Sequence, residues 1–346
     1  AQYKATDGMP NDWHFVHYAE RAKGGAALVF TEMLCVSMQG RITPGCPCLT
    51  PEQVPAWKRL TDFAHTETKA KICAQIGHAG RKGSTRLAWD GIDKPLPEGE
   101  NWDLLSASAL PLMEGNVVPK EMDRADMDLV TEQFVASVKA ADAASFDMIE
   151  MHAAHGYLLA SFISPVTNKR SDEYGGSLEN RMRYPLEVFH AMRAAWPAEK
   201  PMTVRISAHD WMEEGGITPQ DAVAIAQMFK DAGVTAMNVS SGQTDKAEKP
   251  IYGRMFQVPF SDRVRNEVGI PTLVAGNIYE PDHVNSTLMA GRADLVLLAR
   301  PHLADPYWTL HAAVELGDTE QEWPAPYEGG KRQANTLAER AKAMAT

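Results

Sequence analysis

The chain has 346 residues, of which 44% are hydrophobic, enough for one large barrel domain or two smaller domains. It carries 34 Lys and Arg against 45 Asp and Glu, a formal charge of −11, and it has no basic block, which argues against a nucleic-acid partner. No apolar run approaches the roughly 20 residues of a membrane helix, and no signal peptide is visible. The four cysteines match no metal-site spacing. We therefore expect a cytoplasmic protein with reduced thiols and no membrane segment.

Strand and helix patterns alternate along the chain. Strands are predicted at residues 26–30, 71–76, 148–151, 202–206, 234–239, 272–275 and 294–298. Helical spacing fills the intervals, for example at 12–23, 125–144 and 281–290. Such alternation with short connections predicts a parallel sheet.

The number of strand–helix units favours an α/β fold of the (β/α)8 TIM-barrel type over residues 1–325, followed by a C-terminal tail at 326–346. About seven units are visible, and the chain begins abruptly like a fragment, so we expect the first strand to precede Ala1. No GxGxxG motif follows a strand, which counts against a Rossmann domain. Periodicity fails at 83–123, after the third strand, and Trp89 and Trp102 there favour an ordered cover loop over a disordered insert.

The stretch from Asp147 to Pro165 carries the strongest chemical signal. His152, His155 and Tyr157 lie within six residues, directly after a buried strand. Because α/β enzymes place active groups at the carboxyl ends of parallel strands, these side chains are candidates to bind an oxygen and supply a proton. The alternatives are packed core histidines, a metal-dependent hydrolase using His152 and His155, and a non-catalytic ligand-binding barrel. Apart from Glu150 no third metal ligand is near, so we predict no metal.

Other predicted strand ends also offer ligand-binding groups. They are Thr31, Gln75, Arg205, Ser241, Gly242, Gly276, Asn277, Ala299 and Arg300. The last two pairs follow strands seven and eight, where barrels often bind phosphate through backbone N–H groups. An amide and a guanidinium could hold a flat heterocycle, so bound flavin mononucleotide (FMN) satisfies the whole set. Alternatively, Arg205 forms an ion pair with Glu150 or Asp210, and Gly276 serves only a tight turn.

The chain resembles the old yellow enzyme family of FMN-dependent ene-reductases over nearly its whole length. The most specific motifs are HAAHGYLLASFISP at 152–165 and DEYGGSLENR at 172–181, supported by QIGHAGRK at 75–82. The resemblance implies an FMN-dependent oxidoreductase that uses NADH or NADPH to reduce C=C bonds conjugated to a carbonyl.

The resemblance also implies residue roles. His152 and His155 would hydrogen-bond the substrate carbonyl, Tyr157 would be the proton donor, and Tyr3 would line the pocket. The FMN contacts would be Met33, Gln75, Arg205, Gly276, Asn277, Ala299 and Arg300. Arg81, with Lys82 or Lys169, would supply cations for the phosphates of a CoA substrate.

Within the family, AQYKATDG at 1–8 and SSGQTDKAEKPIYGRMFQ at 240–257 are similar to the C-terminal reductase half of aminobenzoyl-CoA/salicylyl-CoA monooxygenase/reductase flavoproteins. This similarity implies a hydroxylated aromatic acyl-CoA substrate, a role in aromatic compound degradation, and a fused or partner flavin monooxygenase domain. The family also implies a homodimer. There are three departures from the family pattern. Ala1 stands where relatives have a flavin-tuning Cys, the region near Gly329 lacks an arginine of the relatives for which Lys331 or Arg332 could substitute, and the cover loop at 83–123 is longer.

Overall fold

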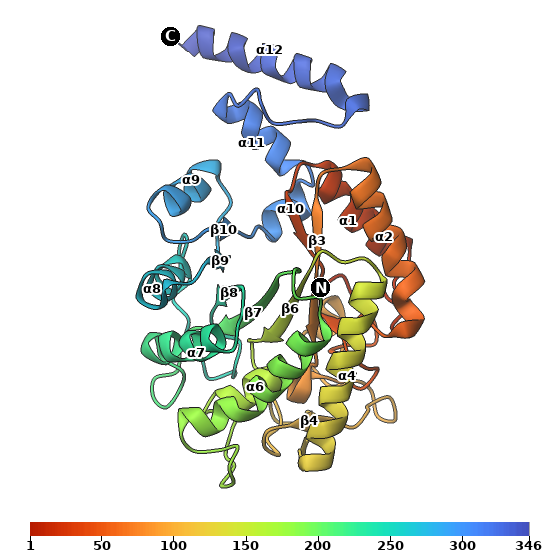
Figure 1. Ribbon diagram of the computed structural model, residues 1–346, viewed down its shortest axis with the longest axis vertical. Helices are drawn as coiled ribbons and strands as arrows, with labels where there is room; N and C mark the ends of the chain where they lie inside the picture. The colour runs from red at the N-terminus through yellow and green to blue at the C-terminus, as the bar shows by residue number, and fades with distance from the viewer. Residues whose placement is uncertain (346) are drawn as a thin grey trace.

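The computed structural model describes residues 1–345, which form a parallel sheet covered by helices (Figure 1). Within these residues seven strands follow one path and an eighth, β2 (Leu34–Cys35), pairs beside β3. The strands of the path are β1 (Leu28–Phe30), β3 (Lys71–Gly77), β6 (Met148–Ala153), β7 (Met202–Ser207), β8 (Ala236–Ser240), β9 (Thr272–Val274) and β10 (Leu295–Val296). Neighbours along the path are consecutive strands of the barrel, and every pair is parallel.

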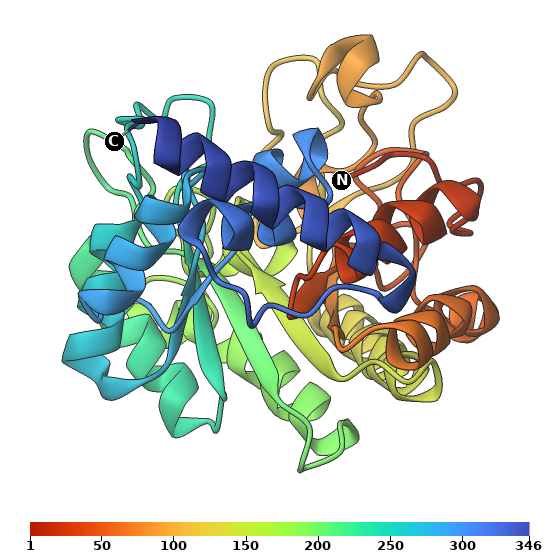
Figure 2. The same ribbon diagram turned by 90° about the horizontal axis from the view of Figure 1, so that it is seen from above.

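The parallel strands follow one another in chain order and alternate with helices, as in a (β/α)8 barrel, so the predicted fold class is confirmed. Viewed from above, the helices surround the strands (Figure 2). The strand expected ahead of Ala1 would lie between β1 and β10, and within residues 1–345 no pairing joins these two strands. That first strand therefore stays a prediction.

The main helices are α1 (Asp12–Lys23), α2 (Val54–Glu67), α4 (Arg124–Ala143), α6 (Leu178–Ala195), α7 (Pro219–Asp231), α8 (Val258–Val264), α9 (Pro281–Met289) and α11 (Trp308–Leu316). Four of these eight main helices, α1, α4, α6 and α7, begin at a residue whose side chain caps the first turn. Asn11, Asp123 and Thr218 each form a capping box, in which side chain and backbone bond reciprocally. Glu280, at the N-cap of α9, makes no side-chain capping bond, which agrees with the poor capping preference of glutamate.

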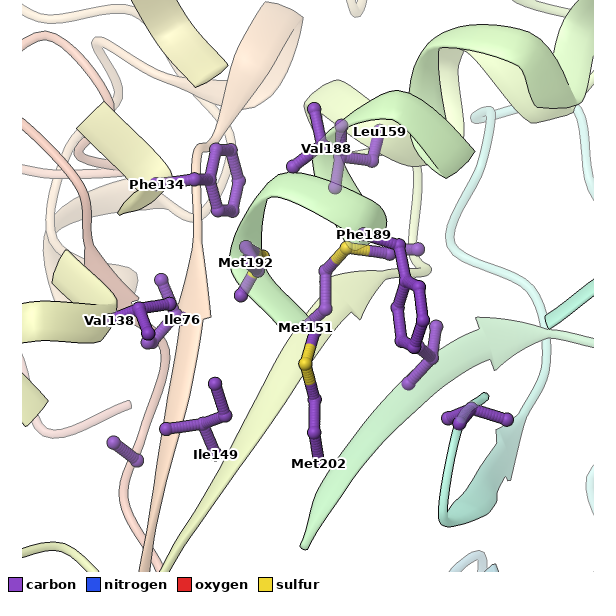
Figure 3. Packing of buried hydrophobic residues seen from close by; sticks show 14 of the residues in the cluster. Ile76, Phe134, Val138, Ile149, Met151, Leu159, Val188, Phe189, Met192 and Met202 are labelled. Atoms are coloured by element: carbon purple, nitrogen blue, oxygen red, sulfur yellow. The ribbon is translucent and has the colours of Figure 1, made fainter. Parts of the chain in front are cut away.

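One part of the core lies between the sheet and helices α4 and α6 (Figure 3). Phe134 from α4 and Phe189 from α6 have no solvent exposure, and they share one cluster with Ile149 and Met151 of β6. Every residue of β6 is buried, because helices cover its outer face and the barrel interior its inner face. The core thus fixes the position of the strand that carries the candidate site.

The insertion at 83–123 contains short helical and strand elements that were not predicted from its sequence. It contains α3 (Ala88–Gly91) and a two-stranded sheet of β4 (Leu105–Ser106) and β5 (Lys120–Glu121). Trp102 donates its Nε1–H to the carbonyl of Gln39 at 3.1 Å, which fastens the insertion to the barrel.

The predicted C-terminal tail is a helix as far as it is described. It forms α12 (Glu328–Ala345), which lies beside α11 and away from the barrel strands in Figure 1. Calling residues 326–346 a tail therefore missed a long helix of amphipathic sequence. No helix among the described residues combines the length and the apolar character needed to cross a membrane.

Replacing Phe134 by Ala should lower the free energy of unfolding by about 3–5 kcal/mol, because it removes a fully buried ring between α4 and the sheet. Leu129→Ala on the exposed side of α4 is the matched control, with an expected change within about 0.5 kcal/mol. Urea unfolding of both variants at one fixed FMN concentration makes the comparison. Equal losses in the two variants would contradict this description of the core.

Candidate active site

The carboxyl end of β6 turns sharply and presents three functional side chains. His152 is the fifth residue of the strand, and His155 and Gly156 follow it in left-handed conformations with φ of 60° and 70°. A side chain at Gly156 would place its Cβ 2.8 Å from the carbonyl oxygen of Thr244, so only glycine fits there. Tyr157 then caps α5 (Leu158–Ile163). The turn brings the three predicted catalytic residues together.

The rings of His152, His155 and Tyr157 form one cluster. Nε2 of His152 lies 3.3 Å from Nδ1 of His155, and Nε2 of His155 lies 2.7 Å from Oγ of Ser240 on β8. The ring of Tyr157 meets that of His152 edge-on, with 4.9 Å between centroids. Two imidazoles and a phenol therefore face one small region at the end of the barrel.

Burial and nearby cations keep both imidazoles neutral. The pKa values of His152 and His155 lie well below the ordinary histidine value. The main cause is burial, and the next is the positive charge of Arg205. Burial likewise raises the pKa of the Tyr157 hydroxyl well above its ordinary value. At neutral pH the three groups are therefore uncharged hydrogen-bond donors and acceptors.

Lys82 is a further cation at this site, and the sequence suggested a different role for it. Its Nζ donates to the carbonyls of His155 at 3.0 Å and Gln243 at 2.9 Å, and it lies 5.3 Å from the centroid of the Tyr157 ring. Burial lowers the pKa of this ammonium to about 8. Lys82 thus ties the catalytic turn to the loop after β8, and it does not face solvent as a CoA-binding cation would.

The centre of the barrel holds a buried carboxylate. Glu150 is fully buried and accepts hydrogen bonds from Gln75 at 2.8 Å, Thr203 at 3.0 Å and Asn238 at 2.9 Å. Burial raises its pKa, against the opposing charge of Arg205. The network fixes the amide of Gln75, which was predicted to contact a flavin ring.

Arg205 is the strongest sign of a missing ligand. Within residues 1–345 its side chain forms no hydrogen bond and no ion pair at contact distance with Glu150 or Asp210, although its charge acts on the buried carboxylate of Glu150. Its Nε and the Oδ1 of Asn238, its neighbour in the sheet register, are buried without partners. Buried polar atoms are rarely left unpaired. An unfulfilled donor beside an unfulfilled acceptor fits a heterocycle with carbonyl and N–H groups, such as the FMN ring system.

The predicted phosphate-binding positions lie after β9 and β10. They are Gly276, Asn277, Ala299 and Arg300, and none of their backbone N–H groups donates to an acceptor within residues 1–345. Gly276 has a φ of 117°, and an added Cβ would lie 2.6 Å from Nε2 of Gln257. Glycine is thus needed at this turn, and the free N–H groups are available to an anion.

The remaining predicted residues divide into two groups. Met33 packs in one apolar cluster with Tyr3 and Tyr157, so the structure brings these three together. Arg81 is instead buried, with its guanidinium bonded to Asp245 at 2.9 Å and to backbone carbonyls, which leaves it a structural role. No group of three or more metal-ligating side chains is present in the described part of the chain.

Sequence reasoning missed Ser240 and Asn238, which contact His155 and Glu150. Both lie on β8, at positions whose register with β7 is given by the pairs Arg205–Asn238 and Ser207–Ser240. The available signal was two polar residues inside an otherwise apolar strand, which indicates an inward-facing polar position.

The comparisons with known proteins agree on the family. Residues 2–319 match the model of the NADH:flavin oxidoreductase / NADH oxidase family. NADPH dehydrogenase from Geobacillus sp. (strain WCH70) is 40% identical over 90% of this chain and 86% of its own. NADPH dehydrogenase from Geobacillus thermodenitrificans (strain NG80-2) is 39% identical over 94% of this chain and 90% of its own.

Two solved structures share the fold. A 2-naphthoyl-CoA reductase in complex with 2-naphthoyl-CoA is 25% identical with a TM-score of 0.78, and the match covers 88% of this chain and 47% of that chain. Morphinone reductase is 24% identical with a TM-score of 0.73, covering 93% and 85% of the two chains. The family match excludes the metal-hydrolase and non-catalytic alternatives. The chain belongs to the NADH:flavin oxidoreductase family, the old yellow enzyme family, and is an FMN-dependent NAD(P)H oxidoreductase.

Proposed function

We propose that this enzyme uses NADPH or NADH to reduce C=C bonds conjugated to a carbonyl group. The observation that carries the proposal is the pair of neutral imidazoles, whose facing nitrogens lie 3.3 Å apart beside the Tyr157 ring. Two N–H donors aimed at one oxygen polarise a carbonyl and stabilise the negative charge that develops on it. His152 pairs with Arg205 in the sheet register, and the Nε of Arg205 is buried without a partner, which supports a flavin site next to that oxygen.

The residues have the following proposed roles. His152 and His155 bind the carbonyl oxygen, and Tyr157 donates its hydroxyl proton to the carbon next to that carbonyl. Tyr3 shares an apolar cluster with Tyr157 and lines the substrate pocket. When bound, FMN supplies the hydride after its reduction by NAD(P)H.

FMN would be held by side chains at one end and by backbone at the other. Gln75 and Arg205 would contact the ring system, and the backbone of Met33 would approach its edge. The phosphate would be held by Gly276, Asn277, Ala299 and Arg300. The unpaired buried atoms of Arg205 and Asn238, and the free N–H groups after β9 and β10, support this placement.

The substrate is proposed to be an enone or an aromatic acyl-CoA. Both have a carbonyl conjugated to the reducible bond, and a structural relative is a reductase in complex with 2-naphthoyl-CoA. The cations first expected to bind the CoA phosphates are not available, because Arg81 and Lys82 are bonded within the fold. Lys169 differs from these two in being exposed: its ammonium donates to the carbonyl of Pro165 at 2.7 Å at the surface, and it would serve this role in the acyl-CoA version of the proposal. The homodimer and the fused or partner monooxygenase domain rest on the resemblance alone.

Tyr157→Phe should slow alkene reduction by roughly 10²- to 10⁴-fold, because it removes the proton donor while keeping the ring. Reduction of FMN by NADPH, the preceding half-reaction, should change little. Stopped-flow absorbance of the flavin, first with NADPH and then with cyclohexenone or an aromatic acyl-CoA, measures each half-reaction separately.

The outcome has a clear control. Tyr174→Phe alters a tyrosine whose hydroxyl bonds Arg124 of α4 and Glu187 of α6, two helices that pack on the outer face of the sheet, and it should leave both half-reactions near the parent rates. Equal loss in both half-reactions of Tyr157→Phe would count against a proton-donor role. A protein that cannot be loaded with FMN would contradict the whole assignment.

The imidazoles of His152 and His155 should stay neutral as the pH falls through about 6.5, the ordinary histidine pKa, because burial and Arg205 lower their pKa values. The unfolded chain then binds more protons than the folded chain, so these residues should make the fold less stable as the pH falls below about 6.5. NMR titration of ¹³C-labelled imidazoles, assigned with His152→Gln and His155→Gln, tests this. Protonation of either ring at or above about 6.5 would refute it.

A further inference from the structure

The hydrogen bonds around the histidine pair run in one direction. The backbone N–H of Ala154 donates to Nδ1 of His152 at 3.2 Å, so that nitrogen carries no proton. In a neutral ring the proton is then on Nε2, which donates to Nδ1 of His155 at 3.3 Å. His155 must therefore carry its own proton on Nε2, 2.7 Å from Oγ of Ser240. The Ser240 hydroxyl in turn donates to Oε1 of Gln257 at 3.2 Å.

These hydrogen bonds are compatible with the site without substrate but not with a substrate carbonyl bound by both imidazoles. For both imidazoles to donate to one carbonyl oxygen, His155 must carry its proton on Nδ1 instead of Nε2. Its Nε2 then needs a donor, since a buried acceptor without a partner costs roughly 1–3 kcal/mol. In the described part of the chain, the group within hydrogen-bond distance of this Nε2 is the hydroxyl of Ser240.

Ser240 can reverse its bond without leaving another group unpaired. A hydroxyl has one hydrogen and can turn it from Gln257 to His155. Oε1 of Gln257 keeps a donor, because the hydroxyl of Ser241 also bonds it, at 2.9 Å. Ser240 is 3% exposed, so water does not readily take over its role. The two rings carry two N–H protons both before and after this change. His155 loses the proton on its Nε2 and gains one on its Nδ1, so the pair takes up no net proton.

We propose that Ser240 is a positioning residue that selects the tautomer of His155. With its hydrogen on Gln257 it stabilises the resting tautomer, and with its hydrogen on Nε2 of His155 it stabilises the tautomer in which both imidazoles donate to the substrate carbonyl. The inference rests on the proposed function, since it assumes that the pair binds a carbonyl oxygen.

Three variants test the role of the hydroxyl. Ser240→Ala removes it, Ser240→Thr retains it, and Ser241→Ala removes the neighbouring hydroxyl that bonds Gln257 but not His155. FMN content and thermal unfolding establish that each variant is folded and loaded. Cyclohexanone, a saturated ketone that cannot be reduced at a C=C bond, serves as the carbonyl probe, and its dissociation constant is measured from changes in the flavin absorbance.

We expect Ser240→Ala to bind cyclohexanone roughly tenfold more weakly, because one hydrogen bond of the bound state is lost, with flavin reduction by NADPH unchanged. Ser240→Thr should bind it within about twofold of the parent. Ser241→Ala should weaken binding as well, because Oε1 of Gln257 then loses its last hydroxyl donor when Ser240 turns to His155, but His155 should still change tautomer when ketone saturates this variant. ¹⁵N NMR of labelled histidine should show His155 changing from the Nε2–H to the Nδ1–H tautomer on addition of ketone in the parent, and losing this change in Ser240→Ala.

Two results would overturn the inference alone: unchanged ketone affinity and tautomer response in Ser240→Ala, or loss of the tautomer response in Ser240→Thr, which retains the hydroxyl. Failure of the parent enzyme to bind ketones or reduce enones, with FMN bound, would instead overturn the proposed function. The two failures are thus separated by the behaviour of the parent protein.

Discussion

The close approach of two neutral imidazoles at the end of β6 is the interaction on which the account depends. An imidazole pair 3.3 Å apart is strongly disfavoured when both rings are protonated, because two positive rings would repel each other. Burial inside the barrel and the fixed charge of Arg205 keep both rings neutral. A neutral pair can donate hydrogen bonds to a carbonyl oxygen. Two imidazolium ions could donate as well, but their mutual repulsion would make that arrangement costly.

The turn after β6 converts a regular strand into this arrangement. His155 and Gly156 adopt left-handed conformations, which a folded chain keeps only if its surroundings determine them. The ammonium of Lys82 supplies part of that determination, because it bonds the carbonyls of His155 and Gln243, two residues with positive φ on different loops. Through Lys82, the position of the turn that carries His155 therefore depends on the loop after β8.

The sequence allowed the main elements to be predicted, and it indicated the candidate catalytic residues that the structure brings together. Hydrophobic periodicity located the strands within a few residues, and the spacing of His152, His155 and Tyr157 after a buried strand indicated oxygen-binding chemistry. Contacts between residues far apart in the chain could not be predicted from spacing. Arg81 pairs with Asp245 across 164 positions, and this pairing turned an expected substrate contact into a structural one. The bond direction through Ser240 likewise depends on sheet register, which a single strand does not reveal.

The central claim is that the paired imidazoles bind a carbonyl oxygen beside FMN held at Arg205. A crystal structure of the FMN-loaded enzyme with cyclohexanone tests it most directly. The account predicts the ketone oxygen within about 3 Å of both Nε2 of His152 and Nδ1 of His155, with the flavin ring against the guanidinium of Arg205. A ketone bound away from the two histidines, or a flavin that leaves Arg205 without a partner, would contradict it.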